Sequence, residues 1–131
     1  MEKCIIKVKG IVTDGSDYLV LKKWYDDRIG EPYQWEFPEG TVEFGESPDH
    51  AVERVVSEAT GITATSMKPL YTWQYMLGDV SYIGICYLLY TSVEEVVISE
   101  EYTESMWINR LEFSDYITDP KLLTDIERAE L

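Results

Sequence analysis

The sequence has little histidine and little cysteine. Its single histidine is His50, so a histidine-rich metal site is excluded. Its two cysteines, Cys4 and Cys86, lie in apolar, strand-like runs with no metal-ligand spacing between them. We expect both to be small buried residues. The chemistry of the chain is therefore expected to depend on oxygen and nitrogen groups other than imidazole and thiolate.

Long apolar runs are also missing. No stretch approaches the roughly 18 apolar residues of a membrane-spanning helix. The first ten residues, MEKCIIKVKG, have no long apolar core and no small-residue cleavage site, so they are not typical of a secretory signal. We therefore expect a cytoplasmic protein with no membrane partner.

Basic residues are few. The 25 Asp and Glu residues outnumber the 11 Lys and Arg residues, and the formal net charge is −14. Such a field repels polyanions, which argues against a long nucleic-acid partner. Clustered carboxylates can still attract divalent cations, and a cation can bring a phosphate ligand with it.

The 131 residues predict one domain that buries a core without disulfide or metal support. Apolar alternation and turn residues predict strands at 3–13, 18–25, 34–38, 70–76, 81–93 and 105–109, with hairpins joining the first two and the two long later ones. A capping Ser47, Pro48 and Gly61 delimit a helix, and a second helix follows Pro120. This order predicts an α+β fold, or an α/β/α sandwich around a mixed sheet.

One segment, from Trp35 to Ile62, is a loop, a helix and a second loop. This segment contains a fixed spacing pattern. A Gly is followed after five residues by a Glu, and after seven more residues by an Arg that begins an Arg-x-apolar-x-Glu-x-x-Gly-apolar run. The residues on this pattern are Gly40, Glu46, Arg54, Val56, Glu58, Gly61 and Ile62. The segment resembles the Nudix hydrolase family, and its Trp-Glu-Phe-Pro lead-in resembles the MutT-like branch. We call residues 40–62 the box.

The resemblance implies a Nudix-type α/β/α sandwich with a mixed sheet over residues 1–131. It also implies hydrolysis of a nucleoside diphosphate linked to another group. Family members use Mg²⁺ or Mn²⁺, and they are often homodimers. The substrate class is then a small nucleotide-type molecule, and the box alone does not specify which one.

Three positions depart from the family pattern. Val55 and Ala59 stand where the family has glutamates, and Glu39 stands where many relatives have glycine. On a helix, positions 55, 58 and 59 share one face, where three carboxylates could converge on a hard cation. Only Glu58 remains there, so we expect any divalent metal to bind weakly.

The candidate site residues follow from the box and its surroundings. The catalytic candidates are Glu58, Glu46, Arg54 and Glu43, with Glu43 or an acid from Glu100 to Glu104 as base and Arg54 orienting a carboxylate. The metal candidates are Glu58, Glu46 and Glu104. The substrate-binding candidates are Lys23, Arg28, Phe37 and Gly40. Trp35, Phe37, Trp73 and Tyr75 could stack on a base, although packing in the core or on the sheet is the more common role of such residues.

Three interpretations of the altered box are open. The chain is an active hydrolase with substitute carboxylates, a slow or single-metal enzyme built on Glu58, or a Nudix-shaped module that binds a nucleotide-type ligand without cleaving it. Three or more carboxylates converging near Glu58 would favour hydrolysis. Packed Val55 and Ala59 with an isolated Glu58 would favour binding or an altered function.

Overall fold

The fold is built on a parallel pair of long strands. The computed structural model describes residues 2–24, 34–92 and 95–131. Strand β1 (Lys3–Thr13) runs parallel to β6 (Val80–Tyr90), from Lys3 opposite Val80 to Thr13 opposite Tyr90. Strand β5 (Ser66–Leu77) lies antiparallel to β6 and forms the predicted hairpin with it.

The remaining strands complete a mixed sheet. Strand β2 (Tyr18–Lys23) pairs with β3 (Trp35–Glu36) on one side and with β7 (Tyr102–Ile108) along its length, and β4 (Glu39–Thr41) pairs with β1. Across the described ranges the sheet has seven strands, in the order β3-β2-β1-β6-β5, with β4 and β7 off this path.

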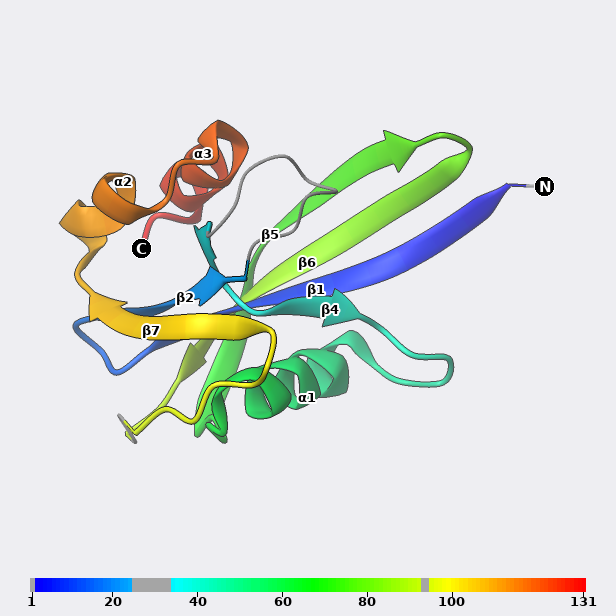
Figure 1. Cartoon of the computed structure of the whole chain (residues 1–131). Helices are drawn as coiled ribbons and strands as arrows, with labels where there is room; N and C mark the ends of the chain where they lie inside the picture. The colour runs from blue at the N-terminus through cyan, green and yellow to red at the C-terminus, as the bar shows by residue number, and fades with distance from the viewer. Residues whose placement is uncertain (1, 25–33, 93–94) are drawn as a thin grey trace.

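Helices cover both faces of the sheet (Figure 1). Helix α1 (Pro48–Thr60) packs its valines and alanines against one face, in a cluster that includes Val8, Val12 and Leu89. A 3₁₀ turn (Arg110–Glu112), α2 (Phe113–Tyr116) and α3 (Pro120–Ala129) cover part of the other face, over Ile11, Val20 and Leu88. The predicted α/β/α arrangement with a mixed sheet is confirmed. Within the described ranges, no helix is both long and apolar enough to cross a membrane.

Three sequence-based expectations need correction. Strands β1 and β2 pair at their turn, where Thr13 lies opposite Tyr18, because β6 occupies one edge of β1 and β4 pairs with β1 from Lys7 to Lys9. The short strand β4 falls in a stretch expected to be a loop. Cys86 is buried as expected, but Cys4 is exposed near the beginning of β1. Sequence alternation identifies strands but does not identify the partner of each strand.

Candidate functional site

The box folds as a loop followed by a helix because its ends carry strong capping groups. The Ser47 hydroxyl accepts a hydrogen bond from the backbone N–H of His50 at 3.1 Å, and Pro48 occupies the first turn. At the other end, Gly61 adopts a left-handed conformation (φ 72°) and its N–H donates to the Ser57 carbonyl at 2.8 Å. These caps fix the angle at which α1 presents its charged side chains.

Arg54 is the centre of the charged cluster on α1. Its Nε and Nη2 donate to the two carboxylate oxygens of Glu46 at 2.9 and 3.0 Å, which is a bidentate pair. Its Nη2 also donates to the Thr41 carbonyl at 2.9 Å. Its Nη1 lies 3.8 Å from Glu43 and 3.6 Å from Glu58. Arg54 therefore connects the loop to the helix, and it lies within ion-pair distance of the two exposed glutamates, Glu43 and Glu58.

Glu46 is fully engaged by these contacts. In addition to Arg54, it accepts from the Glu43 backbone N–H at 3.1 Å and contacts His50 Nδ1 at 3.0 Å. The hydrogen bonds from Arg54, followed by the one from the Glu43 backbone, lower the pKa of Glu46 to about 2. Glu46 thus remains an anion across the physiological range, and its oxygens are occupied by donors.

The two replaced positions belong to the core. Val55 and Ala59 are only 7% and 5% exposed, and both pack in the cluster under α1. A Cβ atom added at Gly40 would lie 2.6 Å from Cγ2 of Val55, so Val55 fills the space beside the β4 backbone. The face of α1 that is expected to carry metal-binding glutamates in the family packs against the apolar core in this chain.

The residues present do not fit a protein-held divalent metal at the box. Mg²⁺ requires several oxygen ligands in near-octahedral arrangement. Here Glu46 is bound to Arg54, and the Glu58 side chain is 68% exposed and paired with the same arginine. In the part of the chain that the structure describes, no group of three or more His, Cys, Asp or Glu side chains is arranged to hold an ion.

The structure does not bring Glu104 to Glu58 and Glu46. Glu104 lies opposite Lys22 in the β2–β7 pairing, and its carboxylate is 3.3 Å from the Lys22 ammonium group. Lys22 lies over the Trp35 ring, which packs in the cluster on the α2–α3 side of the sheet. Glu104 is therefore on the sheet face opposite α1. Its spacing in the sequence could not show which face of β7 it occupies.

The predicted substrate-binding residues separate into different environments. Phe37 is 1% exposed and contacts Phe113 edge-to-face, with a centroid distance of 6.0 Å, so it is a core residue. Lys23 pairs with Glu36 at 3.3 Å, and burial raises the pKa of Glu36 even though Lys23 opposes this. Gly40 packs against Val55. Arg28 lies outside the described residues.

A second charged group lies on the sheet face opposite α1. Glu39 of β4 is 3.0 Å from the Lys7 ammonium group and 3.7 Å from that of Lys9. Lys9 lies 4.6 Å from the centroid of Trp73, and Lys7 lies 6.0 Å from that of Tyr82. Tyr82 in turn stacks on Tyr75 at 4.8 Å. We call Lys7, Lys9, Trp73, Tyr75 and Tyr82 the lysine–aromatic face.

Sequence reasoning named Trp73 and Tyr75 as possible stacking residues but did not combine them with the lysines into one face. Its signals were present, because Lys7 and Lys9 alternate on β1 and Glu39 departs from the family pattern. The missing information was the pairing of β4 with β1, which places Glu39 opposite Lys9. Burial alone would lower the pKa of Lys7, but the Glu39 carboxylate outweighs it, so the pKa is raised and the lysine stays charged.

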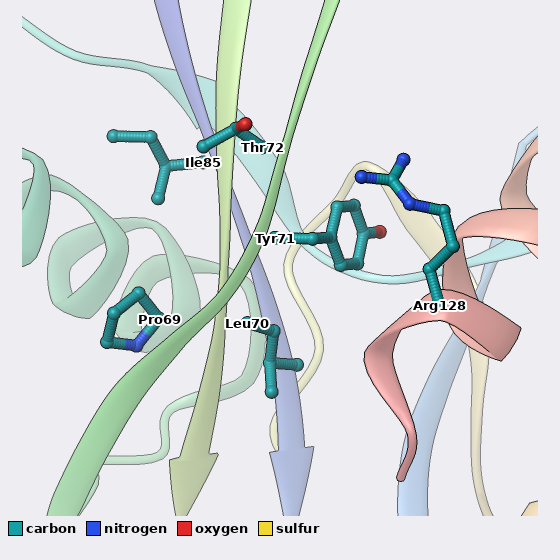
Figure 2. Close-up of a pocket in the computed structure, with 6 residues that line it drawn as sticks. All are labelled: Pro69, Leu70, Tyr71, Thr72, Ile85 and Arg128. Carbon is teal, nitrogen blue, oxygen red and sulfur yellow. The ribbon is translucent and has the colours of Figure 1, made fainter.

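A cavity of about 460 Å³ lies at the outer edge of the sheet, between β5 and α3. Figure 2 shows Arg128 of α3 reaching over Tyr71 of β5, with the guanidinium 5.7 Å from the ring centroid. The Tyr71 hydroxyl is buried next to the Cys86 thiol but has no hydrogen bond of standard geometry. Burial raises the pKa of Tyr71, so the hydroxyl stays protonated.

Tyr71→Phe is expected to keep or increase stability. A buried hydroxyl without a hydrogen bond costs about 1–3 kcal/mol of desolvation, and the substitution removes that cost without opening a cavity. We expect the free energy of unfolding in urea to rise by about 1 kcal/mol. A loss of stability of similar size would show that the hydroxyl has a bonding partner in solution.

Comparison with known proteins agrees with the geometry of the fold and box. The family model described as the NUDIX domain matches residues 6–125. The crystal structure of a MutT protein from Methanosarcina mazei Go1 is similar, with 25% identity, a TM-score of 0.82, and coverage of 98% of this chain and 94% of that one. A MutT structure from a study of Aliivibrio salmonicida and Vibrio cholerae is 26% identical, with a TM-score of 0.70 and coverage of 96% and 99%.

A more distant match shares the fold alone. It is the NUDIX domain of Shewanella oneidensis NrtR, solved with ADP ribose, at 16% identity and a TM-score of 0.72, with coverage of 99% of this chain and 87% of that one. Since the family model covers most of the sequence, and the box loop, helix and mixed sheet are all in place, this chain belongs to the NUDIX family.

Proposed function

We propose that this chain binds a nucleoside diphosphate linked to another group, and that its pyrophosphohydrolase activity is orders of magnitude below that of a chain with three box carboxylates. The burial of Val55 and Ala59 carries this proposal. Metal-assisted hydrolysis needs ions that neutralise the developing charge and activate water. A box with one exposed glutamate on that face has lost most of the oxygens that would hold them.

The ligand class is supported by the similar structures and by the chain's own residues. One neighbour was solved with ADP ribose, and another is a C. elegans Ap4A hydrolase complex, matched at 17% identity and a TM-score of 0.71. Aromatic rings beside lysines, as on the lysine–aromatic face, suit a base and a phosphate group. The partner is therefore a small nucleotide-type molecule.

Slow hydrolysis is the second candidate, and one observation favours it. Glu43 and Glu58 are both largely exposed, and each forms only a long ion pair with Arg54, at 3.8 and 3.6 Å, so a substrate carrying its own cation can approach both carboxylates. In that case Glu58 and Glu43 would face the phosphates of the substrate as the carboxylates closest to the reaction, and Arg54 would position both. The Mg²⁺ or Mn²⁺ would arrive mainly with the phosphates of the substrate.

A ligand and activity panel separates the two candidates. ADP-ribose, Ap4A and nucleoside triphosphates are assayed for heat of binding and for product release, with Mg²⁺ and with Mn²⁺. We expect measurable binding of at least one compound and turnover orders of magnitude below typical enzyme values of about 10 s⁻¹. Ordinary turnover that Glu58→Gln abolishes would establish the hydrolase instead. Absence of binding to every compound would overturn the proposed ligand class.

A further inference from the structure

We propose that this chain binds the diphosphate of its ligand without a divalent cation, with Lys7 and Lys9 supplying the positive charge and Glu39 as their internal counter-ion. The inference rests on the proposed function, because it assumes a ligand with a diphosphate group. It concerns a different part of the molecule from the box helix. It also accounts for a charged residue, Glu39, that the box pattern does not explain.

Charge is the first argument. The two ammonium groups of Lys7 and Lys9 share the carboxylate of Glu39. Glu36 also interacts with Lys9 and Glu39 but is paired with Lys23, so these three lysines and two glutamates together keep one excess positive charge. A further ammonium group, that of Lys121 on α3, lies 5.3 Å from the centroid of Tyr75 on the same face. The chain as a whole has a net charge of −14, so a cluster of lysines creates a local positive potential in a mostly negative molecule. Such a local potential attracts an anion.

Partial burial strengthens that field. The side chains of Lys7 and Lys9 are only 22% and 13% exposed, so water screens their charge less than at an open surface. Glu39 is similarly shielded, at 32%. Two lysines held in this way are pre-ordered, so binding an anion costs little side-chain entropy.

The aromatic rings give the face a second recognition element. Trp73 lies over Gly84 of β6, where any Cβ atom would collide with the indole ring. Trp73 is thereby held against the sheet, with Lys9 over its ring. Tyr75 and Tyr82 continue the surface as a stacked pair. A ligand with a planar base next to an anionic group matches this order of rings and ammonium groups.

The face is continuous with the box through strand β4. Glu39 lies opposite Lys9, Gly40 opposite Val8, and Thr41 opposite Lys7. The Thr41 carbonyl accepts a hydrogen bond from Arg54. A ligand held by the lysines would therefore lie along the strand that leads into the box loop. The ammonium groups lie on the sheet face opposite α1, so such a ligand would meet the box at its beginning, Gly40 and Thr41, and not at the buried positions 55 and 59.

The test is titration of the whole chain with ADP-ribose in excess EDTA and in Mg²⁺. We expect the two Kd values to agree within about threefold, since the charge is supplied by side chains rather than by an ion. Lys7→Gln with Lys9→Gln should raise Kd by about tenfold or more, because each lost charge-assisted contact weakens binding. Glu39→Gln should lower Kd, because the amide no longer competes with the phosphate for the two ammonium groups.

Lys3→Gln is the matched control. Lys3 is an exposed residue of the same strand, four positions from Lys7 and so about 13 Å away at the strand rise. The loss of one positive charge there should leave Kd nearly unchanged, because salt screens exposed charges beyond about 10 Å. Circular dichroism and thermal unfolding of each variant check that the fold is kept. If the double variant fails to fold, Glu39→Gln and the EDTA comparison still decide the question.

The outcomes distinguish this inference from the proposed function. If ADP-ribose and the other nucleotide-type compounds fail to bind under both conditions, the proposed function fails. If ADP-ribose binds only with Mg²⁺, or if the lysine variant binds as tightly as the parent chain, the proposed function stands and the metal-free inference is overturned. A rise in Kd for Glu39→Gln would also overturn the role given to Glu39 as a competing counter-ion.

Discussion

Replacing Val55 and Ala59 together by glutamate is expected to destabilise the fold by more than about 3 kcal/mol in the absence of metal. Both positions are almost completely buried, and Val55 fills the space beside Gly40. Two carboxylates placed there lose hydration, and Arg54, the arginine of α1, is already bound to Glu46. The measurement is equilibrium urea unfolding in EDTA.

Divalent metal should reverse part of this loss. Positions 55, 58 and 59 lie within about one turn of α1, so three carboxylates there could converge on one ion. We expect Mg²⁺ or Mn²⁺ to raise the Tm of the Val55→Glu/Ala59→Glu variant but not that of the parent chain, and a gain in pyrophosphohydrolysis would accompany it. Val55→Gln/Ala59→Gln is the matched control, since it has similar size but no charge for the ion. A glutamate variant as stable in EDTA as the parent would show that these positions are open to water.

The Glu46–Arg54 pair is expected to make stability depend on acid. The folded-state pKa of Glu46 is about 2, below its ordinary value of 4.5. A group with a depressed pKa stabilises the fold fully above its unfolded-state value and loses that contribution as the pH falls through the folded-state value. The free energy of unfolding should therefore decline between about pH 4.5 and pH 2, with Glu46 contributing to the slope.

A double-mutant cycle tests this origin. Glu46→Gln should flatten the acid limb of the profile and lower stability at neutral pH. Arg54→Gln should lower stability more, because it leaves the nearly buried Glu46 carboxylate without its main partner and also frees the Thr41 carbonyl. The two effects should be less than additive when combined, since each variant breaks the same bonds. Strict additivity, with an unchanged acid limb, would place the pH dependence elsewhere.

Local signals predicted the helix of the box well and the site around it less well. Ser47, Pro48 and Gly61 act within one turn of the helix ends, so the sequence alone located α1 from Pro48 to Thr60. The helical spacing of the small apolar residues Ala51, Val52, Val55, Val56 and Ala59 also indicates one buried face, and Val55 and Ala59 do lie in the core. The position of Glu104 could not be predicted in this way, because its distance from Glu58 depends on which face of β7 it occupies and on which strand β7 joins.

The lysine–aromatic face shows the same limit. Each member was visible as part of an alternating strand, but β4, β1, β6 and β5 come together only through pairings between distant segments. Phe37 illustrates the opposite error, since a phenylalanine beside the box was a candidate ligand contact and is instead part of the core under α2. Hydrophobicity alone does not distinguish a residue that binds a ligand from one that packs.

The parallel pairing of β1 with β6 has a consequence for how the chain folds. Each residue of β1 pairs with one 77 positions later, from Lys3 with Val80 to Thr13 with Tyr90. Contacts of such long separation slow folding, because a large loop must close before they form. During synthesis β1 emerges long before β6, so one backbone edge of β1 stays without its hydrogen-bonding partner until β6 is made. The local β5–β6 hairpin can form first and then receive β1, which makes this docking step the expected kinetic bottleneck and the point at which a nascent chain is most exposed to aggregation.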